Sequence, residues 1–233
     1  GTGAGGAVVA RELAEQGHAV VLLEEGEYRT RADFTGRMSD AQRKLYRDFG
    51  ATVTIGNTNI PVPIGMSVGG TTTVNSGTCY RFPDRIGAHW AKEFGLDELT
   101  IDKLGPHYEK VEKILGVAPN PPEYTGKLGD IIARGCDHLG WKHAPIPRNA
   151  PDCDGQGFCC FGCPTDAKRS MNVSYVPMAL KDGAQLFTGI RANRLILENG
   201  RAVGVVGTGR GGQELTVRAR AVVVACGSLI TPG

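Results

Sequence analysis

The sequence predicts an α/β fold with a Rossmann-like parallel sheet and a three-stranded antiparallel meander, truncated at both ends. A glycine-rich turn, G-x-G-x-x-G, runs from Gly1 to Gly6, and the amphipathic stretch after it ends at Gly17. An apolar run from Ala19 to Leu23 follows and stops at two acidic residues. This succession is typical of the second half of a dinucleotide-binding βαβ unit.

Each position of the turn has a physical role. Gly1 permits a tight turn, Gly3 lets the backbone approach a pyrophosphate, and Gly6 lets the helix pack closely on the sheet. The helix N-terminus offers unpaired N–H groups and a partial positive charge to phosphates. An acid about twenty residues further on can accept hydrogen bonds from a ribose diol. Either Glu24 or Glu25 stands at that position.

Length, charge and composition exclude several classes of protein. A chain of 233 residues can bury a sizeable core. A formal net charge of +2 with mixed signs gives no footprint for nucleic acid or an anionic membrane. No apolar run approaches the roughly twenty residues that a membrane span needs. The seven cysteines are odd in number and partly clustered, which favours reduced thiols or a metal over a secreted disulfide scaffold. For localisation, we favour the cytoplasm.

A second glycine-rich segment covers residues 67–78. Gly69 and Gly70 are followed by small hydroxyl residues up to Thr78. Such residues can present N–H and O–H donors to a phosphate or to the edge of a flavin. The alternative is an ordinary turn into a buried helix, and the residues alone do not decide between the two.

The middle of the chain is predicted to be helical. A helix is expected near residues 40–49, and residues 85–115 carry one apolar helical face: Leu104, Tyr108, Val111 and Leu115. A second amphipathic helix is expected to bury Leu128, Ile131, Ile132, Cys136 and Leu139. His89, His107, His138 and His143 have no metal-like or triad-like partners in the sequence and are interpreted as surface or capping residues.

The last third predicts strands. Ile190 to Leu197, Ala202 to Gly207 and Glu214 to Arg220 are expected to form a meander, with Asn199-Gly200 as the first tight turn. A buried strand is expected over residues 221–225. We divide the chain into residues 1–84 (first part of the cofactor domain), 85–150 (a helical insertion or cap) and 151–233 (cysteine-rich loop, meander and returning strand).

Together these pieces resemble the glucose–methanol–choline (GMC) family of FAD-dependent oxidoreductases, with its long-chain alcohol oxidase-like branch as one candidate. The matching stretches are GTGAGG…VVLLEEG, GGTTTVNSGTCYR, GCPTDAKRS…YVP and VVVACGSLITP. The resemblance implies a glutathione-reductase-type FAD-binding domain. Its first strand would lie between the strand ending at Glu24 and the one ending at Cys226. Because nothing precedes Gly1, we expect a fragment whose strands hold unpaired backbone groups, which is therefore unstable alone and binds FAD poorly.

The resemblance also implies which residues hold the cofactor. Ala4 and Gly5 would hold the pyrophosphate, Glu24 the adenosine ribose, and Ala192 the adenine through its backbone. The complete set is Gly1, Gly3, Ala4, Gly5, Gly6, Glu24, Gly69, Gly70, Thr71, Asn75, Ser76, Thr78, Ala192 and Gly227. Some relatives attach FAD to a histidine where Val74 stands here. We therefore predict a non-covalent flavin.

The activity implied is oxidation of an alcohol CH–OH group by hydride transfer to flavin. The family's histidine base and its partner, a histidine or an asparagine, are expected beyond residue 233, so no catalytic residue is assigned and the fragment alone is expected to be inactive. The partners expected are a small-molecule alcohol and an electron acceptor, either O2 or a redox protein. An NAD(P)-linked Rossmann oxidoreductase is the alternative enzyme.

Four clustered cysteines leave several interpretations open. Cys153, Cys159, Cys160 and Cys163 follow the spacing C-x5-C-C-x2-C-P. Converging thiolates could hold zinc or an iron–sulfur cluster, but the spacing matches neither ferredoxin runs nor a paired zinc knuckle. A disulfide and unligated thiols are the other possibilities. A non-enzymatic metal or electron-carrier module built on these cysteines is a further alternative function.

Overall fold

The computed structural model describes residues 1–232, and the chain forms two compact units. The first unit comprises residues 1–76, 157–166 and the residues from 170 onward. The second comprises residues 77–156 and 167–169. The division into functional domains at residues 84 and 150 stays a prediction.

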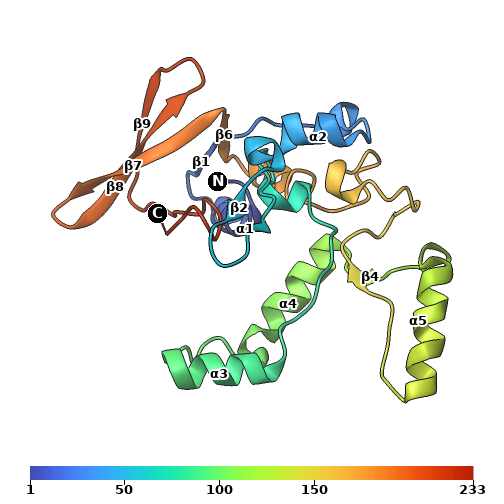
Figure 1. The fold of residues 1–233 in the computed structure, drawn as a ribbon. Helices are drawn as coiled ribbons and strands as arrows, with labels where there is room; N and C mark the ends of the chain where they lie inside the picture. Colours follow the sequence, from blue (N-terminus) through green and yellow to red (C-terminus); the bar gives the residue numbers. More distant parts are fainter. Residues whose placement is uncertain (233) are drawn as a thin grey trace. The chain divides into compact units, whose positions relative to one another are not determined.

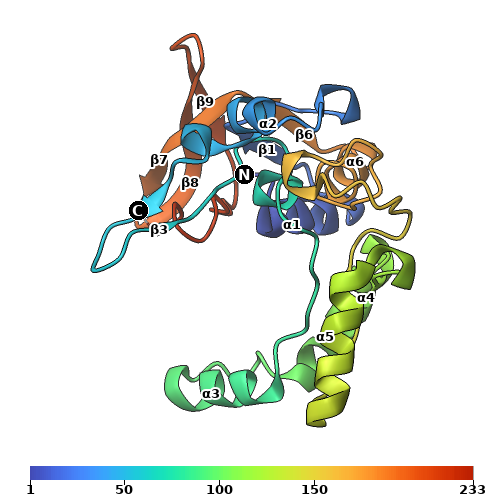
Figure 2. The ribbon, with the colours of Figure 1, turned by 45° about the vertical axis from the view of Figure 1, so that its right-hand side comes forward.

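The first unit begins with the expected turn, helix and strand. Helix α1 (Ala4–Glu15) starts within the glycine turn, and Gly17, two residues after its end, has a φ of 81°. Strand β1 (Val21–Glu24) pairs in parallel with β6 (Gln185–Thr188). Helix α6 (Tyr175–Lys181) packs against α1 (Figure 2). Alanine and glycine on the buried face of α1 let these elements approach closely, and a core with Leu22 forms between them.

A second apolar cluster packs among part of a series of short elements outside the β1–β6 pair. These are η1 (Arg31–Asp33), α2 (Met38–Leu45), η2 (Arg47–Gly50), β2 (Val53–Thr54), β3 (Ile60–Pro61), η3 (Gly70–Thr73) and η5 (Cys159–Phe161). Phe34, Ala41, Leu45 and Val74 form the cluster. The helix expected to reach Phe49 ends at Leu45, because Tyr46 is extended, and Asp48 and Phe49 beyond it have positive φ angles.

The predicted meander is confirmed (Figure 1). Strand β8 (Arg201–Gly209) lies between β7 (Ile190–Glu198) and β9 (Glu214–Arg218), antiparallel to both. Asn199 and Gly200 have φ angles of 50° and 75°, as a type I′ hairpin turn requires.

The buried strand expected over residues 221–225 is wrong in this structure. Within residues 1–232 that segment pairs with no strand, and Val223 and Val224 are 56% and 45% exposed. An apolar run becomes a strand only when a neighbour satisfies its backbone groups. β1 likewise has β6 as its one strand neighbour among the described residues.

The second unit is largely helical. It holds α3 (Asp84–Phe94), α4 (Ile101–Leu115), α5 (Gly126–Leu139), η4 (Pro122–Tyr124) and the short pair β4 (Ala118–Pro119) and β5 (Pro147–Arg148). Phe82 contacts Trp90 and Tyr108, with ring centroids 5.1 and 6.1 Å away, and so joins α3 to α4. No helix formed by the described residues has the length and hydropathy of a membrane span.

The burial predicted for α5 is wrong. Leu128 is 70% exposed and Ile131 is 56% exposed, although the helix itself covers the predicted residues. Cys136 is half-buried rather than enclosed. The spacing of apolar residues specifies a helix, but it does not specify what covers the apolar face.

Candidate dinucleotide site

The two glycine-rich segments meet in the first unit. The Gly69 N–H donates a hydrogen bond of 3.0 Å to the Thr2 hydroxyl oxygen. A β-carbon on Gly70 would lie 3.0 Å from Gly3 Cα, and Gly70 has a φ of 54°, so glycine is favoured there on both counts. The second segment forms one short 3-10 turn, η3, not a buried helix. Residues separated by 67 positions therefore line one place.

Glu24 is a buried acid next to the contact between the two glycine-rich segments. It is 7% exposed. Its Oε2 accepts hydrogen bonds from the Thr2 N–H at 2.9 Å and the Thr2 hydroxyl at 2.7 Å. Its Oε1 accepts one from the Gly26 N–H at 2.9 Å. The carboxylate that the pattern associates with a ribose is thus held against the glycine turn.

The neighbouring acid has a different role. Glu25 accepts a hydrogen bond of 2.5 Å from Arg47 and lies 3.8 Å from Arg191 of β7. The hydrogen bond to Glu25 raises the pKa of the Arg47 guanidinium above its ordinary value. The sequence pattern makes Glu24 and Glu25 equal candidates for the ribose, and the structure separates them: only Glu24 contacts the turn.

The N-terminus of α1 is open for an anion. Ala4 and Gly5 are exposed, and the N-cap residue Gly3 has no side chain with which to cap the helix. The first turn of α1 contains no acidic residue. Uncapped N–H groups at a helix start attract phosphate. These observations fit a pyrophosphate placed above the turn, with Glu24 to one side.

Two further glycines are enclosed by backbone. A β-carbon on Gly1 would lie 2.4 Å from the carbonyl oxygen of Ala225, and one on Gly6 would lie 2.0 Å from the carbonyl oxygen of Gly1. Gly227, two residues after Ala225, has a φ of 96°. The segment after the meander therefore returns to the turn even though it forms no strand.

The remaining predicted cofactor residues are distributed as follows. Thr71, Asn75 and Ser76 follow Gly70 in the same unit and are exposed. Ala192 is exposed on β7, where it pairs with Gly207. Thr78 belongs to the second unit. Val74 is 4% exposed within the cluster of Phe34, Ala41 and Leu45 and carries no nucleophile toward a cofactor.

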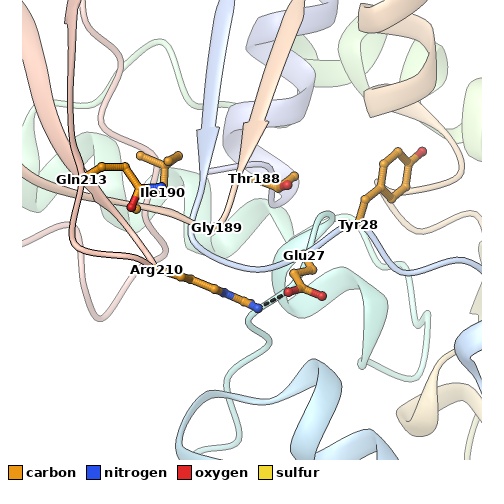
Figure 3. Close-up of a pocket in the computed structure, with 8 residues that line it drawn as sticks. Glu27, Tyr28, Thr188, Gly189, Ile190, Arg210 and Gln213 are labelled. Carbon is orange, nitrogen blue, oxygen red and sulfur yellow. Dashed lines mark hydrogen bonds and ion pairs between the residues drawn. The ribbon is translucent and has the colours of Figure 1, made fainter.

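A separate pocket of ≈ 420 Å³ opens beside β1, β6 and the meander (Figure 3). Glu27 and Arg210 form an ion pair at its edge, and Tyr28, Thr188, Ile190 and Gln213 are among its lining residues. Burial raises the pKa of the Tyr28 phenol. None of the predicted cofactor residues lines this pocket. We place the candidate site at the glycine turn, where uncapped donors and a buried acid converge.

The clustered cysteines do not assemble a centre. Among residues 1–232, no three cysteine, histidine or acidic side chains are placed to hold a metal ion. No disulfide joins any of the seven cysteines, all of which are described. The structure thus gives no support to the zinc, iron–sulfur or disulfide interpretations of Cys153, Cys159, Cys160 and Cys163.

Thr2 is the site residue that sequence reasoning missed. It is fully buried and contacts both Glu24 and Gly69. The glycine pattern leaves its position unspecified, so no signal in the sequence marks it. Thr72 is a second such residue: its hydroxyl donates to the Gly69 carbonyl at 2.6 Å and accepts from the Met171 N–H at 3.0 Å.

Comparison with protein families matches residues 42–233 to the GMC oxidoreductase family. The chain belongs to the GMC oxidoreductases. Members of this family are FAD-dependent flavoproteins. The oxidoreductase and FAD assignments made from the sequence are therefore confirmed at the level of the family.

GMC relatives match over the whole chain. An uncharacterized GMC-type oxidoreductase of Mycobacterium tuberculosis is 44% identical over 234 residues, covering 100% of this chain and 37% of the relative. A long-chain-alcohol oxidase of Arabidopsis thaliana is 30% identical over 244 residues, covering 100% of this chain and 32% of the relative. The chain therefore spans about a third of the length of these relatives.

Solved structures confirm the predicted fold class. Pyridoxine 4-oxidase from Mesorbium loti superposes with a TM-score of 0.70 at 19% identity, over 94% of this chain and 46% of that one. A formate oxidase superposes with a TM-score of 0.62 at 19% identity, over 94% of this chain and 43% of that one. At this identity the likeness establishes the α/β fold.

Proposed function

We propose that the full-length protein is an FAD-dependent oxidoreductase that oxidises the CH–OH group of an alcohol, and that this chain supplies its cofactor-binding part. The observation that carries the proposal is the convergence of the glycine turn, buried Glu24 and the segment at Gly69–Gly70. The similarity to a protein named as a long-chain-alcohol oxidase supports an alcohol as substrate.

The residues of this chain would hold the cofactor from several sides. The N–H groups of Ala4 and Gly5 would bind the pyrophosphate, since they are exposed at an uncapped helix start. Glu24 would accept a hydrogen bond from the adenosine ribose. Ala192 would meet the adenine through its backbone, and Gly227 would lie near the cofactor. Bound FAD supplies the hydride acceptor, and the chain supplies binding and orientation.

The flavin would be bound without a covalent link. Val74 stands where a histidine would be needed, and its side chain is packed among Phe34, Ala41 and Leu45. Thr71, Asn75 and Ser76 would line the cofactor with hydroxyl and amide groups.

The proton-accepting base is assigned outside this chain. All five histidines, His18, His89, His107, His138 and His143, are exposed. His143 contacts Asp137 at 2.9 Å, while both lie in the second unit and away from the glycine turn in sequence. We therefore propose that this chain alone does not oxidise alcohols. We also propose O2 or a redox protein as the electron acceptor, and a cytoplasmic location.

Anaerobic mixing of the full-length protein with primary alcohols of increasing chain length tests this function. An alcohol substrate should bleach the blue flavin band in a single turnover, and readmitted O2 or a dye should restore it. A purified, FAD-loaded protein that no alcohol bleaches would contradict the proposed reaction. A protein that carries no flavin and takes up nicotinamide instead would favour the alternative enzyme.

A further inference from the structure

We propose that Thr2 is a positioning residue that aligns Glu24 and Gly69 for the dinucleotide before the cofactor binds. This inference rests on the proposed function, because it concerns the same site. It adds a residue that neither the glycine pattern nor the family resemblance assigns to cofactor binding.

The Thr2 hydroxyl occupies the centre of a three-part contact. It donates to Glu24 Oε2 at 2.7 Å and accepts from the Gly69 N–H at 3.0 Å. The Thr2 side chain has no solvent exposure. One oxygen atom therefore joins the first glycine turn, the end of β1 and the start of the second glycine segment.

This arrangement leaves the Glu24 carboxylate one open acceptor position. A carboxylate offers about four lone-pair positions. Thr2 fills two on Oε2 through its N–H and its hydroxyl, and the Gly26 N–H fills one on Oε1. The position left open is on Oε1. Thr2 thus fixes which carboxylate oxygen faces a ribose hydroxyl.

The hydroxyl group is what this role needs. Serine keeps the donor and the acceptor of Thr2, whereas valine keeps the shape and removes both. Removing them would leave the Gly69 N–H without its hydroxyl acceptor and would release one bond to Glu24 Oε2. Buried polar groups that lose a partner are costly, so the carboxylate and Gly69 would no longer be held together.

The test measures nucleotide affinity of the flavin-free full-length protein. FAD and ADP are titrated against wild type, Thr2→Val and Thr2→Ser, with flavin fluorescence for FAD and calorimetry for ADP. Ser174→Ala is the control, because Ser174 is a buried hydroxyl in the first unit that donates to the Ser170 carbonyl at 2.9 Å. ADP isolates the half of the cofactor that Glu24 would contact.

Thr2→Val should weaken FAD and ADP by similar factors of at least about tenfold, the loss expected for a buried hydrogen bond to a charged group. Thr2→Ser should stay within about threefold of wild type, and Ser174→Ala should lower thermal stability without a comparable loss of ADP affinity. Unchanged affinities in Thr2→Val, or losses in Thr2→Ser equal to those in Thr2→Val, would overturn the role of Thr2 and leave the proposed function standing. Wild type that binds neither FAD nor ADP would overturn the proposed function together with it.

A second measurement tests the role of Thr2 even if Thr2→Val does not fold. Hydrogen exchange of peptides that cover Gly69 is followed in flavin-free wild type. Slow exchange at the Gly69 amide is expected, because we infer that its bond to Thr2 forms before the cofactor binds. Exchange at the rate of an exposed loop, slowed only when FAD is added, would show that Thr2 does not prearrange the site.

Discussion

Gly70 lies so close to Gly3 that a β-carbon on Gly70 would stand 3.0 Å from Gly3 Cα. The two residues belong to separate glycine-rich segments, and the second segment alone does not distinguish a cofactor site from an ordinary turn. The two segments are in contact, and Glu24 is hydrogen-bonded to Thr2 of the first one. The N–H donors and the acidic side chain of the candidate site therefore lie in one place.

The first prediction concerns two glycines of the same turn. Gly6→Ala should destabilise the full-length protein by about 3 kcal/mol, because the added carbon would lie 2.0 Å from a backbone oxygen. Gly5→Ala is the matched control, since its added carbon meets only the Ala225 side chain at 4.0 Å. It should change stability by less than about 1 kcal/mol. Denaturant unfolding measures both, and equal losses would contradict the close approach of Gly6 to the Gly1 carbonyl.

The second prediction separates the adjacent acids. Glu24→Ala should lower the free energy of unfolding by about 3 kcal/mol and abolish tight FAD binding, because it removes the acceptor of two N–H groups and one hydroxyl. Glu25→Ala should cost about 1 kcal/mol through lost pairing with Arg47 and spare FAD binding. Chemical denaturation and FAD titration report the two effects. A larger loss of FAD affinity in Glu25→Ala would reassign the ribose acid.

A third prediction follows from buried Val74. Acid precipitation of the full-length holoprotein should release its flavin into the supernatant, because the chain offers an apolar side chain where a covalent link would need a histidine. Absorbance of the supernatant and of the redissolved pellet measures the division. Flavin that stays with the pellet and with a peptide of residues 67–78 would contradict non-covalent binding.

The fourth prediction addresses the clustered cysteines. Alkylation of the unfolded protein without reductant should label Cys153, Cys159, Cys160 and Cys163, because no disulfide joins them in the structure. Peptide mass mapping identifies the labelled residues, and an iron assay on the native protein accompanies it. Two of the four escaping the label would reveal a disulfide, and stoichiometric iron would restore the cluster interpretation.

The fifth prediction is a pH dependence in the second unit. Arg81 donates two hydrogen bonds to Glu112, at 2.8 and 2.6 Å, and this contact lowers the pKa of the Glu112 carboxyl below its ordinary value. A lowered folded-state pKa stabilises the fold above the unfolded value of about 4.3, and the stabilisation is lost as pH falls through the folded value.

Wild type should therefore be more stable than Glu112→Gln near neutral pH, and the difference should vanish in acid. Denaturant unfolding at several pH values measures it. Arg81→Gln should remove the same pH-dependent stabilisation, and the double variant should lose no more stability than either single variant. A difference that grows as pH falls would contradict the assigned contact.

Several parts of the fold could be predicted because local chemistry determines them. Asn199-Gly200 tolerates the two positive φ angles of a tight hairpin, so the meander and its first turn could be predicted from the sequence. The glycine turn, α1 and β1 followed from spacing that only a close turn, helix and strand explain. The helical residues of α4 and α5 followed from periodicity.

Other parts depend on partners that no local pattern reveals. Val223 and Val224 have the composition of a buried strand, yet a strand requires a paired neighbour, and they are exposed. Leu128 and Ile131 of α5 have helical spacing without a covering element. β6 lacks a distinctive pattern and gains its place by pairing with β1.

The candidate site shows the same limit. Spacing alone leaves Glu24 and Glu25 equivalent. The family resemblance favours Glu24, and the contacts of Glu24 with Thr2 and of Glu25 with Arg47 separate the two acids in the folded chain. Thr2 itself stands at a position that the glycine pattern leaves open. A contact between segments 67 residues apart, such as Gly69 with Thr2, is a property of the folded chain.

The most direct test of the central claim is a crystal structure of the full-length protein with FAD. The account predicts the diphosphate against the N–H groups of Ala4 and Gly5, a ribose hydroxyl on Glu24, and Gly69–Gly70 beside the cofactor. FAD bound elsewhere, with Glu24 still enclosed by Thr2 and Gly26 and touching no ribose, would contradict it.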